Sequence, residues 1–261
     1  MSKSTLMLPS RLMMVAIVLM SGAGSAIAEG NVTASIANGK TIVTQGKGEA
    51  PACVTCHGEK LLGIDAMGTP RLANIGYTYV VKQLTDFAAD RRTPAGLGAA
   101  MNGFAKALSE QDRRDVAAYV NTLEYKTEPS DLKALEAEGQ QIGKRYLGKR
   151  IVMYGIAGKL NSCESCHGYN GRGADPIFPA INQQKYVYLV NQLKNWRDGS
   201  RNNDPKIGGK VPVMQTVAKK MTDDDIINAA TYLSSAPRVS AGGGRVLDNS
   251  EVLHRVLGVH P

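Results

Sequence analysis

The chain has 261 residues, with 31 lysines and arginines against 23 aspartates and glutamates, a formal net charge of +8 and four cysteines. Hydrophobic residues make up 43% and charged residues 21%, a globular composition that excludes a wholly disordered, collagen-like or polytopic membrane chain. The length predicts one large domain or two smaller ones. The positive charge leaves nucleic acid, an anionic membrane surface or an acidic protein as candidate partners. Four cysteines are too few for a disulfide scaffold.

The first 28 residues have the pattern of a secretory signal peptide. Lys3 and Arg11 precede an apolar run from Leu12 to Met20, and small residues follow up to Ala28. This run of nine residues is shorter than the roughly 20 that a spanning helix needs. We therefore expect cleavage after Ala28 and export to the periplasm. No later apolar stretch is long enough to span a membrane, so we expect a mature chain without a transmembrane segment.

The rest of the chain contains an internal repeat. The pentads Cys53-Val54-Thr55-Cys56-His57 and Cys163-Glu164-Ser165-Cys166-His167 lie 110 residues apart. Later segments correspond at offsets of 109 to 113 residues: Pro70 and Pro179, the amphipathic stretches 77–87 and 186–196, Met101 and Met214, and the final helices with their caps Ser109-Glu110-Gln111-Asp112 and Thr222-Asp223-Asp224-Asp225. A repeat of this length has the size of a small domain. The sequence therefore predicts an all-α protein made of two tandem copies of one helical domain.

The predicted segments are a signal peptide over 1–28, a first half over 29–125, a second half over 126–236 and a tail over 237–261. The join contains Glu128-Pro129-Ser130, which breaks the preceding helix. We expect the opening helix of the first half over 35–46 and that of the second half over 131–147. No long stretch alternates with a period of two, so no sheet is predicted. The tail has no counterpart in the first half, and we interpret it as a frayed terminus, with a docking helix as the alternative.

Each pentad matches the attachment motif of c-type haem. In this motif two thiols form thioethers with the porphyrin and the adjacent histidine binds the iron. A zinc site is disfavoured because 106 residues separate Cys56 from Cys163, and a thioredoxin-like dithiol would need a βαβ context. The sequence therefore predicts two covalently attached haem c groups, bound by Cys53, Cys56, Cys163 and Cys166.

The second axial ligand of each iron is predicted to be methionine. The other two histidines, His254 and His260, both lie in the tail, and methionine is the other common axial ligand of cytochromes c. Among the methionines after residue 28, Met101 and Met214 correspond between the two copies, whereas Met221 aligns with a leucine and is expected in the core. The predicted metal ligands are His57 and Met101 in the first half and His167 and Met214 in the second.

With these motifs, the chain resembles the tandem class I cytochromes c, and most closely the dihaem cytochrome c4 type, over residues 36–236. The resemblance implies two all-α domains that pack pseudosymmetrically with the haems near their interface. It also implies that the carbonyls of Pro70 and Pro179 hold the rings of the ligand histidines. The loops 88–100 and 197–213 differ between the copies, which leaves the partner open.

An iron with histidine and methionine ligands has no open position for a substrate, so we expect an electron carrier and not an enzyme. The resemblance implies a shuttle from a quinol-oxidising complex or a periplasmic dehydrogenase to a membrane-bound terminal oxidase. Two alternatives stay open: an electron-transfer subunit of one dehydrogenase, and a dihaem enzyme, either a peroxidase or a thiosulfate dehydrogenase. We expect a monomer.

The positive charge lies in the second half of the chain. Residues 29–125 hold 10 basic and 10 acidic side chains, and residues 126–261 hold 19 and 13. Bound haems reduce this surplus, which disfavours nucleic acid and favours an acidic redox partner. Four arginines follow the amphipathic stretches and are interpreted either as partners of the haem propionates or as a surface cluster: Arg91, Arg92, Arg197 and Arg201.

Overall fold

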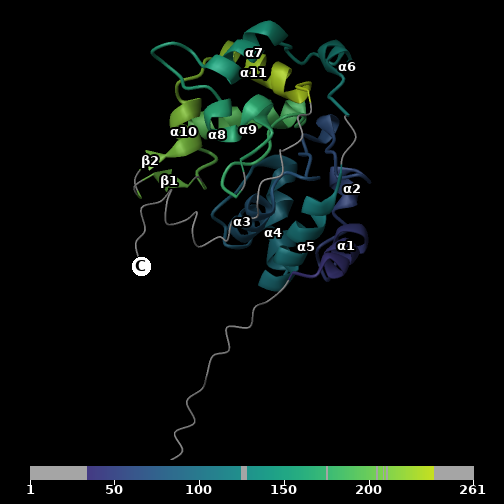
Figure 1. Ribbon diagram of the computed structural model, residues 1–261. Coiled ribbons are helices and arrows are strands. Elements are labelled where there is room, and N and C mark those ends of the chain that lie inside the picture. Colours follow the sequence, from purple (N-terminus) through teal and green to yellow (C-terminus); the bar gives the residue numbers. More distant parts are fainter. Residues whose placement is uncertain are drawn as a thin grey trace, which may run out of the picture. The chain divides into compact units, whose positions relative to one another are not determined.

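The computed structural model describes residues 34–124, 128–174, 176–203, 205–207, 209 and 211–237. These residues are mostly helical, which confirms the predicted fold class (Figure 1). The strands among them are β1 (Lys206–Ile207) and β2 (Val211–Pro212), which pair antiparallel. Within the described part of the chain, no helix has both the length and the apolar character needed to cross a membrane. The predicted signal peptide, and the predicted tail after residue 237, lie outside these residues.

The helices of the two halves correspond in order. The first half contains α1 (Ile36–Gln45), α2 (Val54–His57), η1 (Asp65–Met67), α3 (Tyr77–Ala88), η2 (Gly96–Ala99), α4 (Ala100–Lys106) and α5 (Glu110–Thr122). The second half contains α6 (Leu132–Ala137), α7 (Arg145–Tyr154), α8 (Glu164–His167), η3 (Tyr169–Gly171), α9 (Tyr186–Asp198), α10 (Val213–Ala218) and α11 (Asp223–Ser234). The order of α1 to α5 is repeated by α7 to α11, as the internal repeat predicts.

The opening helices were predicted well in the first half and wrongly in the second. Helix α1 has the expected bounds, with Ser35 as its N-cap and Gly46 as its C-cap. In the second half, the expected helix over 131–147 is interrupted, because α6 ends before Gly139, whose φ of +90° lies in the left-handed region. The counterpart of α1 is therefore α7, which begins at Arg145.

Two glycines allow the first and last helices of each half to cross closely. A Cβ atom at Gly39 in α1 would lie 2.0 Å from the carbonyl oxygen of Asp115 in α5. A Cβ atom at Gly148 in α7 would lie 1.9 Å from the carbonyl oxygen of Asn228 in α11. Only a residue without a side chain fits at either crossing.

The predicted caps of the last helices are confirmed. Ser109 accepts a hydrogen bond from the backbone N–H of Asp112, and the Asp112 side chain accepts one from the backbone N–H of Ser109. Thr222 and Asp225 form the same capping box at α11. These caps fix where both final helices begin.

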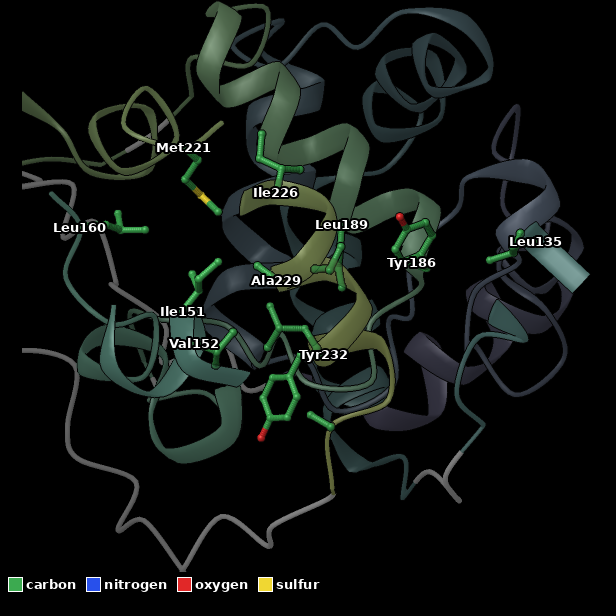
Figure 2. Close-up of a cluster of buried hydrophobic side chains, with 13 residues drawn as sticks. Leu135, Ile151, Val152, Leu160, Tyr186, Leu189, Met221, Ile226, Ala229 and Tyr232 are labelled. Atoms are coloured by element: carbon green, nitrogen blue, oxygen red, sulfur yellow. The ribbon is translucent and has the colours of Figure 1, made fainter. Parts of the chain in front are cut away.

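Each half has its own apolar core. The core of the second half is formed largely by α7, α9 and α11 (Figure 2). Met221 lies in it beside Ile226 and is 4% exposed, which confirms that Met221 is a core residue. The core of the first half contains the corresponding side chains, among them Ile42, Val43, Val116 and Val120.

The described residues of the two halves form one compact unit. Arg71, which is 1% exposed, makes several of the contacts between them. Its backbone N–H donates to Oε1 of Gln184 at 2.6 Å, and Nε2 of Gln184 donates back to its carbonyl oxygen at 3.0 Å. Its guanidinium donates to the carbonyl oxygen of Asn182 at 2.9 Å. The two halves therefore pack directly against each other, as the resemblance implies.

Candidate haem-binding sites

The two pentads fold into the short helices α2 and α8, each ending at its histidine. The backbone N–H of His57 donates to the carbonyl oxygen of Cys53 at 3.0 Å, and that of His167 to the carbonyl oxygen of Cys163 at 2.9 Å. All four cysteines are free and half-buried. Burial raises the pKa of Cys53 to about 11 and that of Cys163 to about 12, so both are thiols at neutral pH. One helical turn thus presents two thiols and one imidazole, the donor set that c-type haem requires.

The two histidine rings are held in the same way. Nδ1 of His57 lies 2.9 Å from the carbonyl oxygen of Pro70, and Nδ1 of His167 lies 2.9 Å from that of Pro179. A carbonyl oxygen only accepts, so Nδ1 carries the hydrogen and Nε2 keeps its lone pair. This geometry confirms that the two proline carbonyls orient the rings.

Both rings are buried and neutral. His57 and His167 are each 7% exposed, and neither Nε2 atom forms a hydrogen bond with a described residue. Burial lowers the pKa of both rings, and the hydrogen bond to the proline carbonyl opposes this only in part. A buried neutral imidazole with an unengaged Nε2 is suited to an iron ligand. The residues present at both sites therefore fit a covalently attached haem.

Glycines at equivalent positions bring each proline back to its histidine. The N–H of Gly63 donates to the carbonyl oxygen of His57 at 2.9 Å, and that of Gly173 to the carbonyl oxygen of His167 at 2.7 Å. Both glycines have positive φ values, +79° and +91°. A Cβ atom at Gly63 would lie 2.6 Å from the carbonyl carbon of Pro70. The close approach of the proline segment therefore requires glycine.

The predicted methionine ligands lie at equivalent places. Met101 is in the first turn of α4 and Met214 in the first turn of α10, and both side chains are half-buried. Helix α4 packs against α3, and α10 packs against α9. The helix α4 follows η2, whereas α10 follows the hairpin of β1 and β2. Their bonds to iron stay a prediction.

The contact between the halves contains a polar cluster that the sequence did not reveal. Arg92 is 7% exposed and donates to Oε1 of Gln83 at 2.7 Å, to Oε1 of Gln192 at 2.9 Å and to the hydroxyl of Tyr188 at 3.2 Å. Its guanidinium lies 4.6 Å from the centre of the Phe87 ring. Arg92 thus binds side chains of both halves at once.

Arg201 makes the corresponding contacts from the other side. It is 6% exposed and donates to Oε1 of Gln192 at 2.8 Å, to the hydroxyl of Tyr79 at 3.1 Å and to Oε1 of Gln83 at 3.3 Å. Its guanidinium lies 4.2 Å from the centre of the Trp196 ring. Burial raises the pKa of Tyr188, but the two guanidiniums outweigh it and lower that pKa overall.

The surface interpretation was therefore wrong for two of the four arginines, Arg92 and Arg201. It holds for Arg91, which pairs with Asp86 at 2.9 Å and is largely exposed. Arg197 pairs with Asp223 at the start of α11. The available signal was the spacing, because Arg92 and Arg201 are separated by 109 residues, as are Gln83 and Gln192.

Comparison with known proteins identifies the family. The cytochrome c family matches residues 36–124 and 153–237. The chain is 35% identical over 215 residues to the thiosulfate dehydrogenase electron acceptor of Stutzerimonas stutzeri, covering 81% of this chain and 92% of that protein. It is 38% identical over 202 residues to the cytochrome c4 of Stutzerimonas stutzeri, covering 72% of this chain and 86% of that protein.

Two solved structures are similar to the chain. The reduced recombinant cytochrome c4 from Pseudomonas stutzeri is 27% identical and has a TM-score of 0.61, covering 78% of this chain and 99% of that chain. A thiosulfate dehydrogenase from Marichromatium purpuratum is 27% identical and has a TM-score of 0.67 over 77% of this chain, which spans only 40% of that longer protein. With two attachment pentads in one repeated helical fold, the chain belongs to the cytochrome c family, as a dihaem member of the cytochrome c4 type with two covalently attached haem c groups.

Proposed function

We propose that this protein is a periplasmic electron carrier that accepts electrons from a thiosulfate dehydrogenase and passes them to a terminal oxidase. The observation that carries the carrier function is the pair of buried, neutral histidines, each with Nδ1 tied to a proline carbonyl. The choice of donor is supported by two relatives that are named thiosulfate dehydrogenase electron acceptors, from Stutzerimonas stutzeri and Thiomonas intermedia. A quinol-oxidising complex is the second candidate donor, because the cytochrome c4 resemblance implies it.

We assign the sites as the sequence predicts them. The thioethers form at Cys53, Cys56, Cys163 and Cys166, and the axial pairs are His57 with Met101 and His167 with Met214. The two haem domains occupy residues 29–125 and 126–236. Each haem supplies a one-electron couple between ferric and ferrous iron, and a methionine ligand favours the reduced state.

The residues of this chain contribute orientation and exclusion of water. The carbonyls of Pro70 and Pro179 fix the plane of each imidazole and make Nε2 a stronger donor. Burial of both rings keeps water away from the nitrogen that binds. Such a rigid, closed site changes little between oxidation states, which favours rapid electron transfer over catalysis at the iron.

The surface beside the second pentad supports an acidic partner. An open depression of about 470 Å³ is lined by Tyr154, Lys159, Lys220 and Ser165, and Ser165 lies between the two cysteines of that pentad. Tyr154 is 76% exposed, while Lys159 pairs with Asp225 at 3.2 Å. With the positive surplus of the second half, this surface would attract a partner that carries carboxylates beside its own redox centre.

The donor is tested by mixing the oxidised holoprotein with a thiosulfate dehydrogenase and thiosulfate, and following haem reduction by absorbance. We expect rapid reduction that slows as ionic strength rises. Lys220→Glu should slow it further, whereas Lys40→Glu, an equal charge change on the exposed face of α1, should not. Rapid reduction by a quinol-oxidising complex but not by the dehydrogenase would refute the proposed donor. Oxidation of thiosulfate by the protein alone, with an artificial acceptor, would establish the enzyme alternative.

The axial ligands are tested by replacing Met101 and Met214 singly with alanine. Each change should open one iron to carbon monoxide and lower one of the two reduction potentials, because a soft ligand is lost. Met67→Ala and Met153→Ala are the matched controls, since neither methionine has a counterpart in the other half. Carbon monoxide binding to both irons of the unmodified reduced protein would contradict the assignment.

A further inference from the structure

Glu164, the first residue of α8, carries a buried oxygen without a partner. Its Oε2 atom is shielded from solvent and has no hydrogen-bond partner among the described residues. Buried polar atoms are almost always hydrogen-bonded, and a buried carboxylate without a partner is costly to stability. Glu164 follows Cys163 directly, so this carboxylate lies within the turn that attaches the second haem.

The first half has no carboxylate at this place. The counterpart of Glu164 is Val54, which packs against the apolar core of the first half. In other respects the two attachment turns are alike, because His57 and His167 are equally buried and have equal distances to their proline carbonyls. The molecule therefore contains its own comparison, in which one turn carries a buried charge and the other does not.

The other charges near this turn are better exposed to water. Arg172, which ends η3, is exposed and lies close to Gly168, the residue after His167. Arg145 stacks over the Tyr232 ring, with its guanidinium carbon 5.1 Å from the ring centre. Neither arginine forms an ion pair with Glu164 in the described part of the chain. Water and salt screen an exposed charge far more than a buried one, so the carboxylate dominates the local field.

We propose that Glu164 lowers the reduction potential of the second haem and thereby makes the two redox sites unequal. Reduction adds one electron and removes one positive charge from the iron centre. A negative charge beside that centre stabilises the oxidised state. A single electron held by the protein then resides mostly on the first haem. The expected bias in the electron distribution is roughly tenfold, the scale of one charge interaction in a partly buried site.

The test is a potentiometric titration of the holoprotein carrying both haems, compared with its Glu164→Gln variant. One of the two reduction steps should move to higher potential, with the electron-distribution constant changed roughly tenfold, and the other step should stay in place. Glu59→Gln removes an exposed carboxylate two residues after His57 and should move neither step. Glu164→Val should shift the same step in the same direction as Glu164→Gln, because both remove the charge.

The reverse change identifies which haem is affected. Val54→Glu should lower the step that Glu164→Gln leaves in place, and Val54→Gln is its uncharged control. If Val54→Glu does not fold, the Glu164 variants still decide the matter. The proposal is overturned if Glu164→Gln, with two haems confirmed by mass, leaves both potentials unchanged or lowers either of them. This outcome is independent of the donor, because the titration contains no partner protein.

Discussion

Replacing Gly148 by alanine should destabilise the second half of the protein by disrupting the crossing of α7 and α11. The added Cβ would lie 1.9 Å from the carbonyl oxygen of Asn228 and 2.9 Å from Cβ of Tyr232. Backbone atoms cannot rotate away as a flexible side chain can. The two helices must therefore separate, and the core between them must open.

The size of the effect follows from the overlap. Ordinary contact begins near 3.4 Å, so the helices must move apart by about 3.4 − 1.9 = 1.5 Å. Overpacking of a core costs about 1 to 3 kcal/mol, and a contact with rigid backbone belongs at the upper end. Against this, alanine favours the helix by roughly 0.5 to 1 kcal/mol relative to glycine. We expect a net loss of about 2 kcal/mol, which lowers the melting temperature by roughly 4 to 8 °C for a protein of this size.

The assay is thermal and guanidinium unfolding of the holoprotein, followed by circular dichroism at 222 nm. Gly103→Ala is the matched control, because Gly103 also lies inside a helix and a Cβ there meets nothing within 4 Å. It should be neutral or slightly stabilising. If Gly148→Ala unfolds at or above the midpoint of the unmodified protein, the crossing is not closely packed and the reasoning fails.

Two further predictions concern charges. Burial raises the pKa of Asp112, but hydrogen bonds from Lys47 and Ser109 outweigh this and lower it to about 2. Since this value lies below that of the unfolded chain, the stabilisation is complete above about pH 4 and is lost as the pH falls towards 2. Acid titrations followed by circular dichroism should show this loss, and Asp112→Asn should remove it. Arg92→Ala should cost about 3 kcal/mol in urea unfolding, because it leaves buried acceptors unpaired, whereas the same change at the exposed Arg91 should cost about 0.5 kcal/mol; equal losses would contradict the role of the buried cluster.

The sequence alone predicted the parts of the molecule that depend on local chemistry. The attachment pentads, the capping boxes and the helix over 35–46 each require particular residue types within one or two turns, so their spacing identifies them. The internal repeat added a second reading of every motif. It separated Met214 from Met221, and the structure places Met221 in the core.

The parts that were missed depend on contacts between distant residues or on very short elements. Periodicity does not tell which helix faces another, so the burial of Arg92 and Arg201 between the halves could not be read from it. The strands β1 and β2 have two residues each, too few for an alternating pattern. In the stretch 131–147 the break at Gly139 was overlooked, although glycine is a common helix terminator.

The contacts of Arg71 bear on the evolutionary history of the protein. Its counterpart in the second half is Ala180, so the tie between the halves was built on one copy only, after the two copies had diverged. A gene shortened to residues 29–125 would lose the carbonyl and amide groups that now pair with this arginine. The ancestral duplication has thus become irreversible: selection can still change each copy separately, but neither copy retains the surface of an independent one-haem protein.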